Sequence, residues 1–173
     1  MLFRTLIEYS DRIRDASARN AKLEIIRDFL SHLKKEEGEI GVNYIGGYTR
    51  QGKLNLTWKG LAELSKVALA HSEHAQDLIG IDTYLERVCA ARGREKFEVL
   101  SPLFAQLSNH ERQFLIKLIV RDVRHGAGEG LVKVAIAQLF NLSEKDVERA
   151  SLHEPELGKL FVFLLEHGAA GIQ

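Results

Sequence analysis

The residues best suited to bind a ligand lie between Arg121 and Lys133, where the sequence reads R-D-V-R-H-G-A-G-E-G-L-V-K. The apolar segment Phe114 to Val123 is predicted to form a helix that runs into the cationic turn Arg124-His125, and a second apolar helix is expected from about Leu131 to Phe140. Glycines between the two helices let backbone N–H groups approach a ligand closely. Because a helix N-terminus presents unpaired N–H groups and partial positive charge, this corner suits an anion, most commonly phosphate.

We call residues 126–130, which contain Gly126, Gly128 and Gly130, the glycine corner. Cations flank it on both sides. Arg121 and Arg124 are three residues apart beside the turn, and Lys133 lies one turn into the next helix, so cations and free N–H groups are predicted to converge on one spot. A simpler interpretation stays open, in which Gly126 ends a helix and Gly128 is a turn residue, as in any tight corner between helices.

Two further clusters combine small residues with cations at helix junctions. In Ser17-Ala18-Arg19-Asn20-Ala21-Lys22, Ser17 or Asn20 can cap a helix, and Arg19 and Lys22 can reach a phosphate. The segment Gly46-Gly47-Tyr48-Thr49-Arg50, with Lys53 nearby, can follow a sugar-phosphate backbone. Each cluster alone is equally explained by a solvated loop. Three such clusters together resemble the way helical proteins grip duplex DNA without reading its sequence.

Catalytic motifs are hard to find in this sequence. It contains no Walker-type loop, no nucleophile elbow and no paired CxxC. His71 and His74 have the helical spacing of metal ligands, but no carboxylate is spaced as in zinc proteases, which favours a solvated pair. The acidic residues Glu36, Glu37 and Glu39 lack the regular oxygen spacing of a metal-binding loop. The sequence therefore predicts no catalytic residue and no metal site, and an enzyme acting on small molecules has little support.

Composition is that of an ordinary globular protein. The 173 residues are 45% hydrophobic and 28% charged, and 24 basic residues balance 24 acidic ones. The distribution is uneven: residues 1–35 hold eight Lys/Arg against five Asp/Glu, residues 112–133 hold five against two, and residues 143–167 hold three against six. Ordinary solvated helix surfaces explain this pattern, but the two basic segments can also form one positive face.

Three features suggest an intracellular protein. No apolar run reaches the length of a membrane span, and charges interrupt the N-terminal apolar stretch, unlike a signal peptide. The single cysteine, Cys89, is expected to be a packed core thiol and suits a reducing compartment. We expect a location in the cytoplasm with the nucleoid, or in the nucleus of a eukaryote.

Helical periodicity dominates the chain, and cap signals predict an all-α fold of roughly eight to ten helices. Capping pairs are predicted at Ser108 and Glu111 and at Ser143 and Asp146, and Thr57 is a candidate N-cap. Asn141 is expected to close the helix before Ser143. Residues 1–167 are expected to form one helical domain, and residues 168–173 the start of a linker.

Other expected boundaries rest on single signals. Lys34-Lys35 and Gly38 are expected to end the second helix. Residues 40–48 alternate like a strand, although their two glycines suit a turn equally well. A third helix is expected to run from Thr57 to about His71, a fourth from about 83 to 92, and the last from Glu154-Pro155 to Gly168. Pro102 is expected to kink a helix or to start a new one.

Residues 114–140, F-L-I-K-L-I-V-R-D-V-R-H-G-A-G-E-G-L-V-K-V-A-I-A-Q-L-F, resemble the N-terminal DNA-binding domain of ATP-dependent DNA ligases. The segment S-A-R-N-A-K-L-E-I-I-R-D-F-L, residues 17–30, and the helix entry Leu107-Ser108-x-x-Glu111 are also similar to that family. The resemblance covers roughly residues 1–165. At His125, many members of the family have an aliphatic residue.

This resemblance implies an all-helical domain that lies across the minor groove of nicked duplex DNA, in replication, repair or recombination. It implies backbone contacts at the matching positions, which are Ser17, Arg19, Lys22, Arg124, Gly126, Gly128 and the N–H groups next to Glu129, with a third contact region at Gly46-Gly47. No lysine here is followed by x-Asp-Gly, the motif in which ligases attach AMP to lysine. By resemblance, the chain does not seal nicks alone.

The partners implied are therefore duplex DNA, nicked, and a ligase catalytic domain in cis or in trans, and no membrane. ATP and Mg²⁺ are expected to serve that catalytic domain, and no cofactor is expected in this chain. A second hypothesis is a helical protein-interaction domain without DNA binding. Zero net charge and abundant apolar helix surface favour it.

Overall fold

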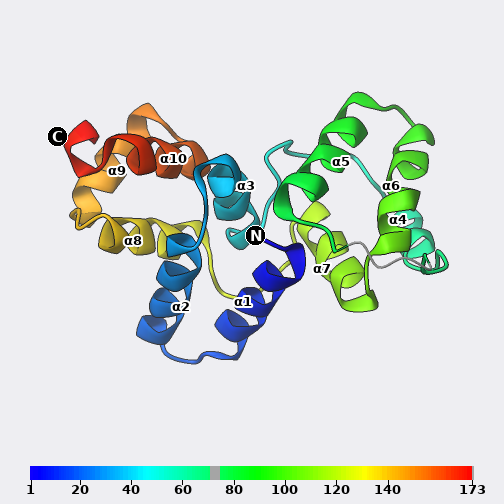
Figure 1. Cartoon of the computed structure of the whole chain (residues 1–173), viewed down its shortest axis with the longest axis horizontal. Helices are drawn as coiled ribbons and strands as arrows, with labels where there is room; N and C mark the ends of the chain where they lie inside the picture. Colours follow the sequence, from blue (N-terminus) through cyan, green and yellow to red (C-terminus); the bar gives the residue numbers. More distant parts are fainter. Residues whose placement is uncertain (71–74, 173) are drawn as a thin grey trace.

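The computed structural model describes residues 1–70 and 75–172, and every regular element in these ranges is a helix. One isolated bridge, between Leu2 and Asp77, is the only strand-like pairing there. The elements (Figure 1) are α1 Phe3–Asp15, α2 Arg19–Ser31, α3 Lys35–Ile45, α4 Trp58–Leu64, α5 Leu78–Ala90, α6 Glu95–Gln106, α7 Asn109–Ile119, α8 Glu129–Leu139, α9 Glu144–His153, α10 Leu157–His167 and the 3-10 turn η1 Ala169–Ile172. The predicted all-α fold is confirmed.

The helices form two groups around a shared core (Figure 1). In the first lobe, which holds α1 to α3 and α8 to α10, α3 packs on α10 and α2 packs on α8. In the second lobe, which holds α4 to α7, both α4 and α5 pack on α6. Contacts of α3 with α5 and of α1 with α7 join the lobes, and Phe3 meets Phe114 edge to face with 5.8 Å between ring centroids. Apolar burial is therefore continuous across the junction.

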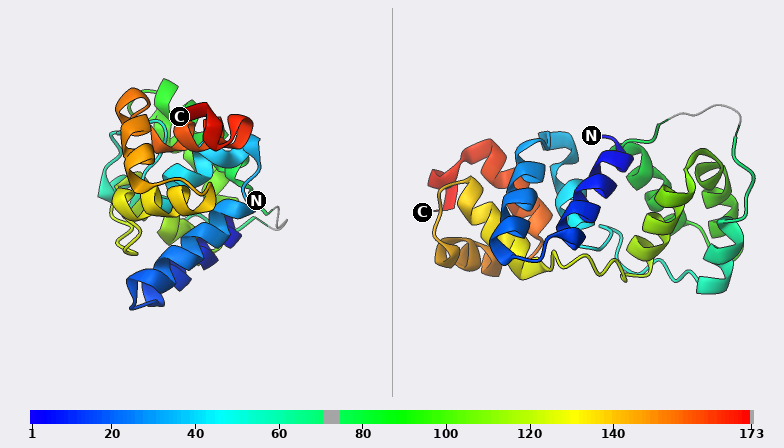
Figure 2. Two further views of the ribbon diagram at one scale, coloured as in Figure 1. Left: turned by 90° about the vertical axis from the view of Figure 1, so that its left-hand side faces the viewer. Right: turned by 90° about the horizontal axis from the view of Figure 1, so that it is seen from below.

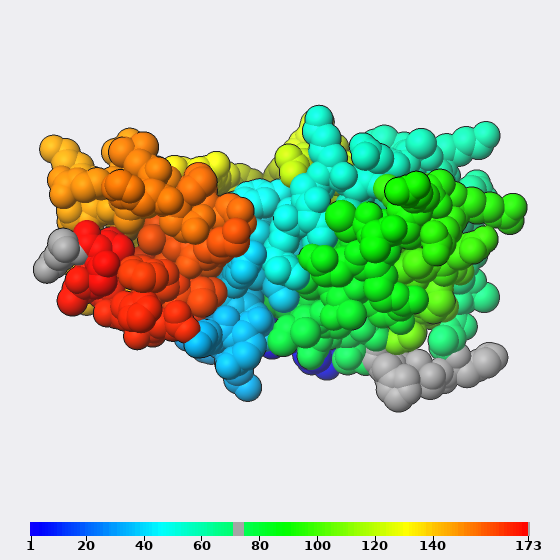
Figure 3. Space-filling view, turned by 90° about the horizontal axis from the view of Figure 1, so that it is seen from above, coloured from blue at the N-terminus to red at the C-terminus, as the bar shows by residue number. Residues whose placement is uncertain are grey.

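The chain passes between the lobes through two loops. Residues 46–57 lead from α3 into the second lobe, and residues 120–128 lead from α7 back to α8. We call these the outward loop and the return loop. Both lie along one long edge of the molecule, the lower edge in the right view of Figure 2 and the upper edge in Figure 3. The return loop contains most of the glycine corner.

Predicted caps that depend on neighbouring residues are confirmed. The Thr57 hydroxyl accepts a hydrogen bond from the Gly60 N–H at 3.2 Å. Ser108 and Glu111 form a complete capping box at the start of α7. The Asp146 N–H donates to the Ser143 hydroxyl at 3.1 Å, as expected for the start of α9. Asn141, at φ 54°, follows the end of α8.

The helix predicted to include residues 114–123 begins at the predicted Ser108 cap but ends earlier than expected. It stops at Ile119, because Arg121 adopts a left-handed conformation with φ 58°. The Asp122 N–H then donates to the Lys117 carbonyl at 2.8 Å, closing the helix as in a Schellman motif. Arg121 occupies the helix-ending position that glycine usually takes, so the interpretation of Gly126 as that residue is wrong.

The expected end of the second helix is also wrong. Helix α2 ends at Ser31, and Lys34 is the N-cap of α3 instead of a C-terminal signal. Gly38 lies inside α3, where a Cβ atom would be 3.0 Å from Val162 of α10. It allows close packing of two helices. The strand-like residues 40–48 form the end of α3 and a turn at Gly46-Gly47.

Two boundaries in the second lobe differ from expectation. Helix α4 ends at Leu64 instead of continuing to His71. His71 and His74 lie outside the described residues. Helix α5 begins at Leu78, five residues earlier than expected, because the Asp77 carboxylate accepts the Gly80 N–H at 2.7 Å.

Three further expectations concern single residues or the chain end. Pro102 lies within a continuous α6 and starts no new helix. Cys89 is exposed on α5, so the core assignment is wrong. Helix α10 begins at Leu157 after a Glu156 N-cap, and residues 169–172 form a 3-10 turn whose Ile172 packs on the core. A linker beginning at 168 stays a prediction. In the described part of the chain, no helix combines the length and apolar character needed to cross a bilayer.

Candidate nucleic-acid interface

The outward and return loops together enclose a surface hollow of about 260 Å³. Gly46 and Gly47 line one side, and the return loop from Arg121 to Gly128 lines the other. Gly47 has φ 89°, and a Cβ atom there would be 3.8 Å from Val123, so the two loops pack against each other. The structure therefore brings two of the three predicted clusters to one place.

Lys22 brings the third cluster to the same place. A Cβ atom on Gly126, where φ is 82°, would collide with the Lys22 ammonium group. This contact follows from the packing of α2 on α8. Among the described residues, neither Arg19 nor Lys22 forms an ion pair with a carboxylate. The ammonium group above Gly126 is thus available to an anion.

The backbone at the glycine corner is open. Gly128 is the N-cap of α8, and no side chain caps the N–H groups of the first turn. A Cβ atom on Gly128 or on Gly130 would have no neighbour within 4 Å. The first N–H groups of a helix have no partner within it, so those of α8 present the positive end of the helix dipole at this corner.

Two arginines of the return loop have left-handed backbones. Arg121 has φ 58° and Arg124 has φ 50°, a region that residues other than glycine rarely adopt. Such strain costs about 1 kcal/mol or more per residue and gathers at functional sites. The Arg124 side chain is 84% exposed and pairs with Asp122. The Arg121 guanidinium lies toward the outward loop, where a Cβ atom on Gly52 would be 3.9 Å from its Nη2.

His125 anchors the return loop inside the protein. Its side chain is buried, with Nε2 2.8 Å from the Ile45 carbonyl oxygen and Nδ1 2.9 Å from the Ser10 hydroxyl. Because a carbonyl oxygen only accepts, Nε2 carries the proton, and in the neutral ring the Ser10 hydroxyl donates to Nδ1. Burial lowers the pKa of His125, and the nearby charge of Lys22 lowers it further, against the raising effect of the Ile45 hydrogen bond. The prediction of a cationic Arg124-His125 turn is thus wrong for His125, which is a neutral tether.

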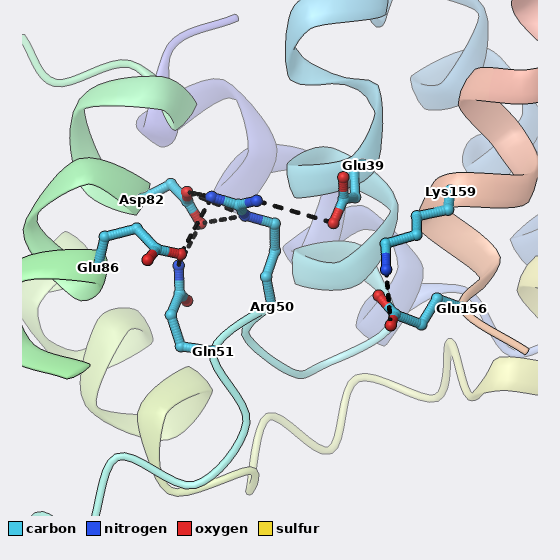
Figure 4. Close-up of polar contacts among 7 residues, drawn as sticks. All are labelled: Glu39, Arg50, Gln51, Asp82, Glu86, Glu156 and Lys159. Carbon is cyan, nitrogen blue, oxygen red and sulfur yellow. Dashed lines mark hydrogen bonds and ion pairs between the residues drawn. The ribbon is translucent and has the colours of Figure 1, made fainter. Parts of the chain in front are cut away.

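Arg50 is positioned differently from the other predicted contacts (Figure 4). Its Nε donates to Asp82 at 3.0 Å, its Nη2 to Glu86 at 3.2 Å, and its Nη1 lies 3.8 Å from Glu39. The hydrogen bond to Asp82 raises the pKa of Arg50 above its usual range. Gln51 also donates to Asp82, at 3.0 Å. These contacts fasten the outward loop to α5 and α3, and Arg50 does not line the hollow. DNA contact by Arg50 stays a prediction.

The remaining predicted residues do not line the hollow. Lys133 is half-buried on α8, and its ammonium group is 3.1 Å from Glu129. Ser17 is exposed, but Ala18 is the N-cap of α2 and no side chain caps this helix, so the capping expected of Ser17 or Asn20 is absent. Ser10 was missed by sequence reasoning. It lies 115 residues from His125, and no local pattern links the two.

Comparisons with known proteins point to one class of enzyme. No family model matches the chain. It is 30% identical over 171 residues to a probable DNA ligase from an Anaeromyxobacter species, covering 96% of this chain and 33% of that protein. It is 32% identical over 155 residues to a probable DNA ligase from Rhodococcus jostii, covering 87% and 30%, and 26% identical over 148 residues to a DNA ligase from Methanobrevibacter smithii, covering 80% and 23%. The chain spans about a third or less of the length of these relatives. It is therefore related to one segment of DNA ligases.

Proposed function

We propose that the chain binds duplex DNA through its phosphate backbone and minor groove without reading sequence, as the DNA-binding part of an ATP-dependent DNA ligase. One observation carries the proposal. Three clusters far apart in sequence, around Lys22, Gly46-Gly47 and Gly126, lie together at a hollow that has cations at its rim and open backbone within it. Fixed N–H groups and cations on a concave surface suit phosphates, which are the same in every DNA sequence.

Catalysis is assigned to another part of the parent protein. Nick sealing would need an adenylated lysine, and the Lys-x-Asp-Gly motif is missing from this sequence. In this proposal the chain holds nicked duplex for a catalytic domain, in cis or in trans, and that domain uses ATP and Mg²⁺. Among residues 1–70 and 75–172, no three His, Cys, Asp or Glu side chains gather in a metal-binding arrangement.

The salt dependence of DNA binding tests the proposal. The clusters around Lys22 and Gly126 carry five cations, of which Arg124 and Lys133 are paired with carboxylates, whereas Arg19, Lys22 and Arg121 have no such partner among the described residues. With three to five phosphates neutralised, the slope of log K against log salt is about −2.7 to −4.5. Affinity for a nicked duplex should then fall about 40- to 500-fold between about 50 and 200 mM salt. Affinity that does not change with salt would refute phosphate binding.

A matched pair of arginine variants locates the contact. Arg124→Ala should weaken binding to every DNA sequence by about 1 kcal/mol, about fivefold, because one charge-assisted contact to a phosphate is lost, from a guanidinium that also pairs with Asp122. Arg149→Ala removes an equal charge from α9, where Arg149 lines a different hollow, and should bind normally. Equal binding by both variants would exclude the return loop as a phosphate site. Failure to bind any DNA, together with a co-purifying protein, would favour the protein-interaction alternative.

A further inference from the structure

The only tryptophan of the chain lies on the surface. Trp58 is 57% exposed and is the first residue of α4. Its backbone is held in place, because Thr57 caps the helix and Gly60 packs so closely under Phe97 that a Cβ atom would collide with that ring. Burying a tryptophan normally stabilises a fold. A large aromatic ring that is left exposed on a fixed backbone is suited to contact a ligand with a flat face.

Cations flank Trp58 in the sequence. Lys53 and Lys59 are exposed on either side of it in the sequence, and neither pairs with a carboxylate among the described residues. Leu54 lies between these two lysines in the sequence, and its carbonyl accepts a hydrogen bond from Lys96 of α6 at 2.7 Å. This contact fixes the outward loop to α6. Proteins that bind unpaired nucleic acid combine these two features, namely an aromatic ring on which a base stacks and cations that hold the adjoining phosphates.

Trp58 is within reach of DNA bound at the glycine corner. Gly52 of the outward loop lies against the Arg121 guanidinium, and Trp58 follows six residues later. Six residues span at most about 21 Å, which is about six base pairs of B-form DNA. The return loop, the outward loop and the start of α4 follow the same long edge in Figures 2 and 3. A duplex lying along this edge would pass both features.

We propose that Trp58 is a stacking platform for an unpaired nucleobase, with Lys53 and Lys59 holding the phosphates on either side. We specify an unpaired base because, inside a duplex, the neighbouring bases already cover both faces of each base and leave no face free for Trp58. The inference rests on the proposed function and deepens it, since the preferred ligand is a duplex with a single-stranded branch within about six base pairs of the glycine corner.

Tryptophan fluorescence tests this directly, because Trp58 is the only source of the signal. Two nicked duplexes are compared, both with hairpin-closed ends so that no terminal base pair is exposed, and one carries a short single-stranded flap at the nick. The flap should quench the fluorescence and increase affinity about five- to tenfold, as expected for one stacked base on an open surface. Trp58→Ala should lose this preference and keep the affinity for the flapless duplex.

Two further variants separate base stacking from a general effect of removing exposed apolar surface. Trp58→Phe should keep part of the preference because a ring remains. Leu152→Ala removes a side chain that is 80% exposed on α9 and should leave the preference unchanged. Equal affinity of wild type for both duplexes, or a preference that survives in Trp58→Ala, overturns the stacking platform while leaving duplex binding intact. Failure of wild type to bind either duplex overturns the proposed function itself.

Discussion

The His125 tether can be tested by removing its two ring nitrogens. His125→Phe keeps an aromatic ring of similar size and leaves two buried groups, the Ile45 carbonyl and the Ser10 hydroxyl, without their partner. Ile45 is the last residue of α3, and the final carbonyls of a helix have no partner within it, so this carbonyl depends on His125. The substitution therefore removes the hydrogen bonds that join the return loop to α1 and to α3.

The expected loss follows from these two groups. A buried polar group left unpaired costs about 1–3 kcal/mol. The Ser10 hydroxyl can turn back to a carbonyl of its own helix, which places its share near the lower end of that range. We therefore expect His125→Phe to lower the free energy of unfolding by about 2–4 kcal/mol. For a domain of this size the midpoint should fall by about 4–16 °C.

A double-mutant cycle read by circular dichroism isolates the hydrogen bond. In the wild-type background Ser10→Ala leaves the Nδ1 lone pair unpaired and should cost about 1 kcal/mol. In the His125→Phe background the same change removes an orphaned hydroxyl and should be nearly neutral. The coupling of about 1 kcal/mol is the signature of direct contact. If His125→Phe is as stable as wild type, or if Ser10→Ala has the same effect in both backgrounds, the tether is refuted.

Buried polar contacts support three more predictions. Because burial lowers the pKa of His125 in the folded state, the unfolded chain binds more protons below about pH 6.5, so wild type should lose more stability than His125→Phe between about pH 7.5 and pH 5.5 in urea unfolding. Arg50→Ala should destabilise by about 1–3 kcal/mol in the same assay, since it leaves the buried Asp82 without its cationic partner and with Gln51 as its remaining side-chain donor, and Asp82→Asn in that background should recover part of the loss. Arg112→Met should lower the thermal midpoint by about 6 °C or more, because the Leu107, Ser65 and Val67 carbonyls lose a donor, whereas the exposed Arg149→Met should not.

Sequence patterns predicted the helix starts best, for a physical reason. Capping at Thr57, Ser108 and Ser143 joins residues three apart, so the signal is complete within a few positions. Helix ends were harder. Helix α7 ends at a left-handed arginine where glycine would be the expected signal, and Gly38 is inside a helix because it packs on α10, more than 100 residues away.

For the candidate site too, local features could be predicted from the sequence and contacts between distant residues could not. Residue types indicated the three clusters, because glycines and cations next to helix ends are local features. Their convergence is set by the packing of α2 on α8 and by the crossing of two loops. The neutral state of His125 and the pairing of Arg50 depend on Ser10 and Asp82, which are 115 and 32 residues away. No spacing rule connects such pairs.

The position of the hollow bears on how a chain with no net charge would hold DNA under the proposed function. The carboxylates nearest to the outward loop, Asp82, Glu86 and Glu39, face Arg50, so their charge is partly neutralised where a phosphate backbone would approach. Lys22 reaches the hollow from α2, and Arg121 lies in the return loop that lines it. The Arg50 ion pairs therefore lie outside the hollow, whereas Lys22 and Arg121, which have no carboxylate partner among the described residues, lie at its rim. Both walls of the hollow belong to connections between the lobes, so a ligand bound there would contact both connections at once.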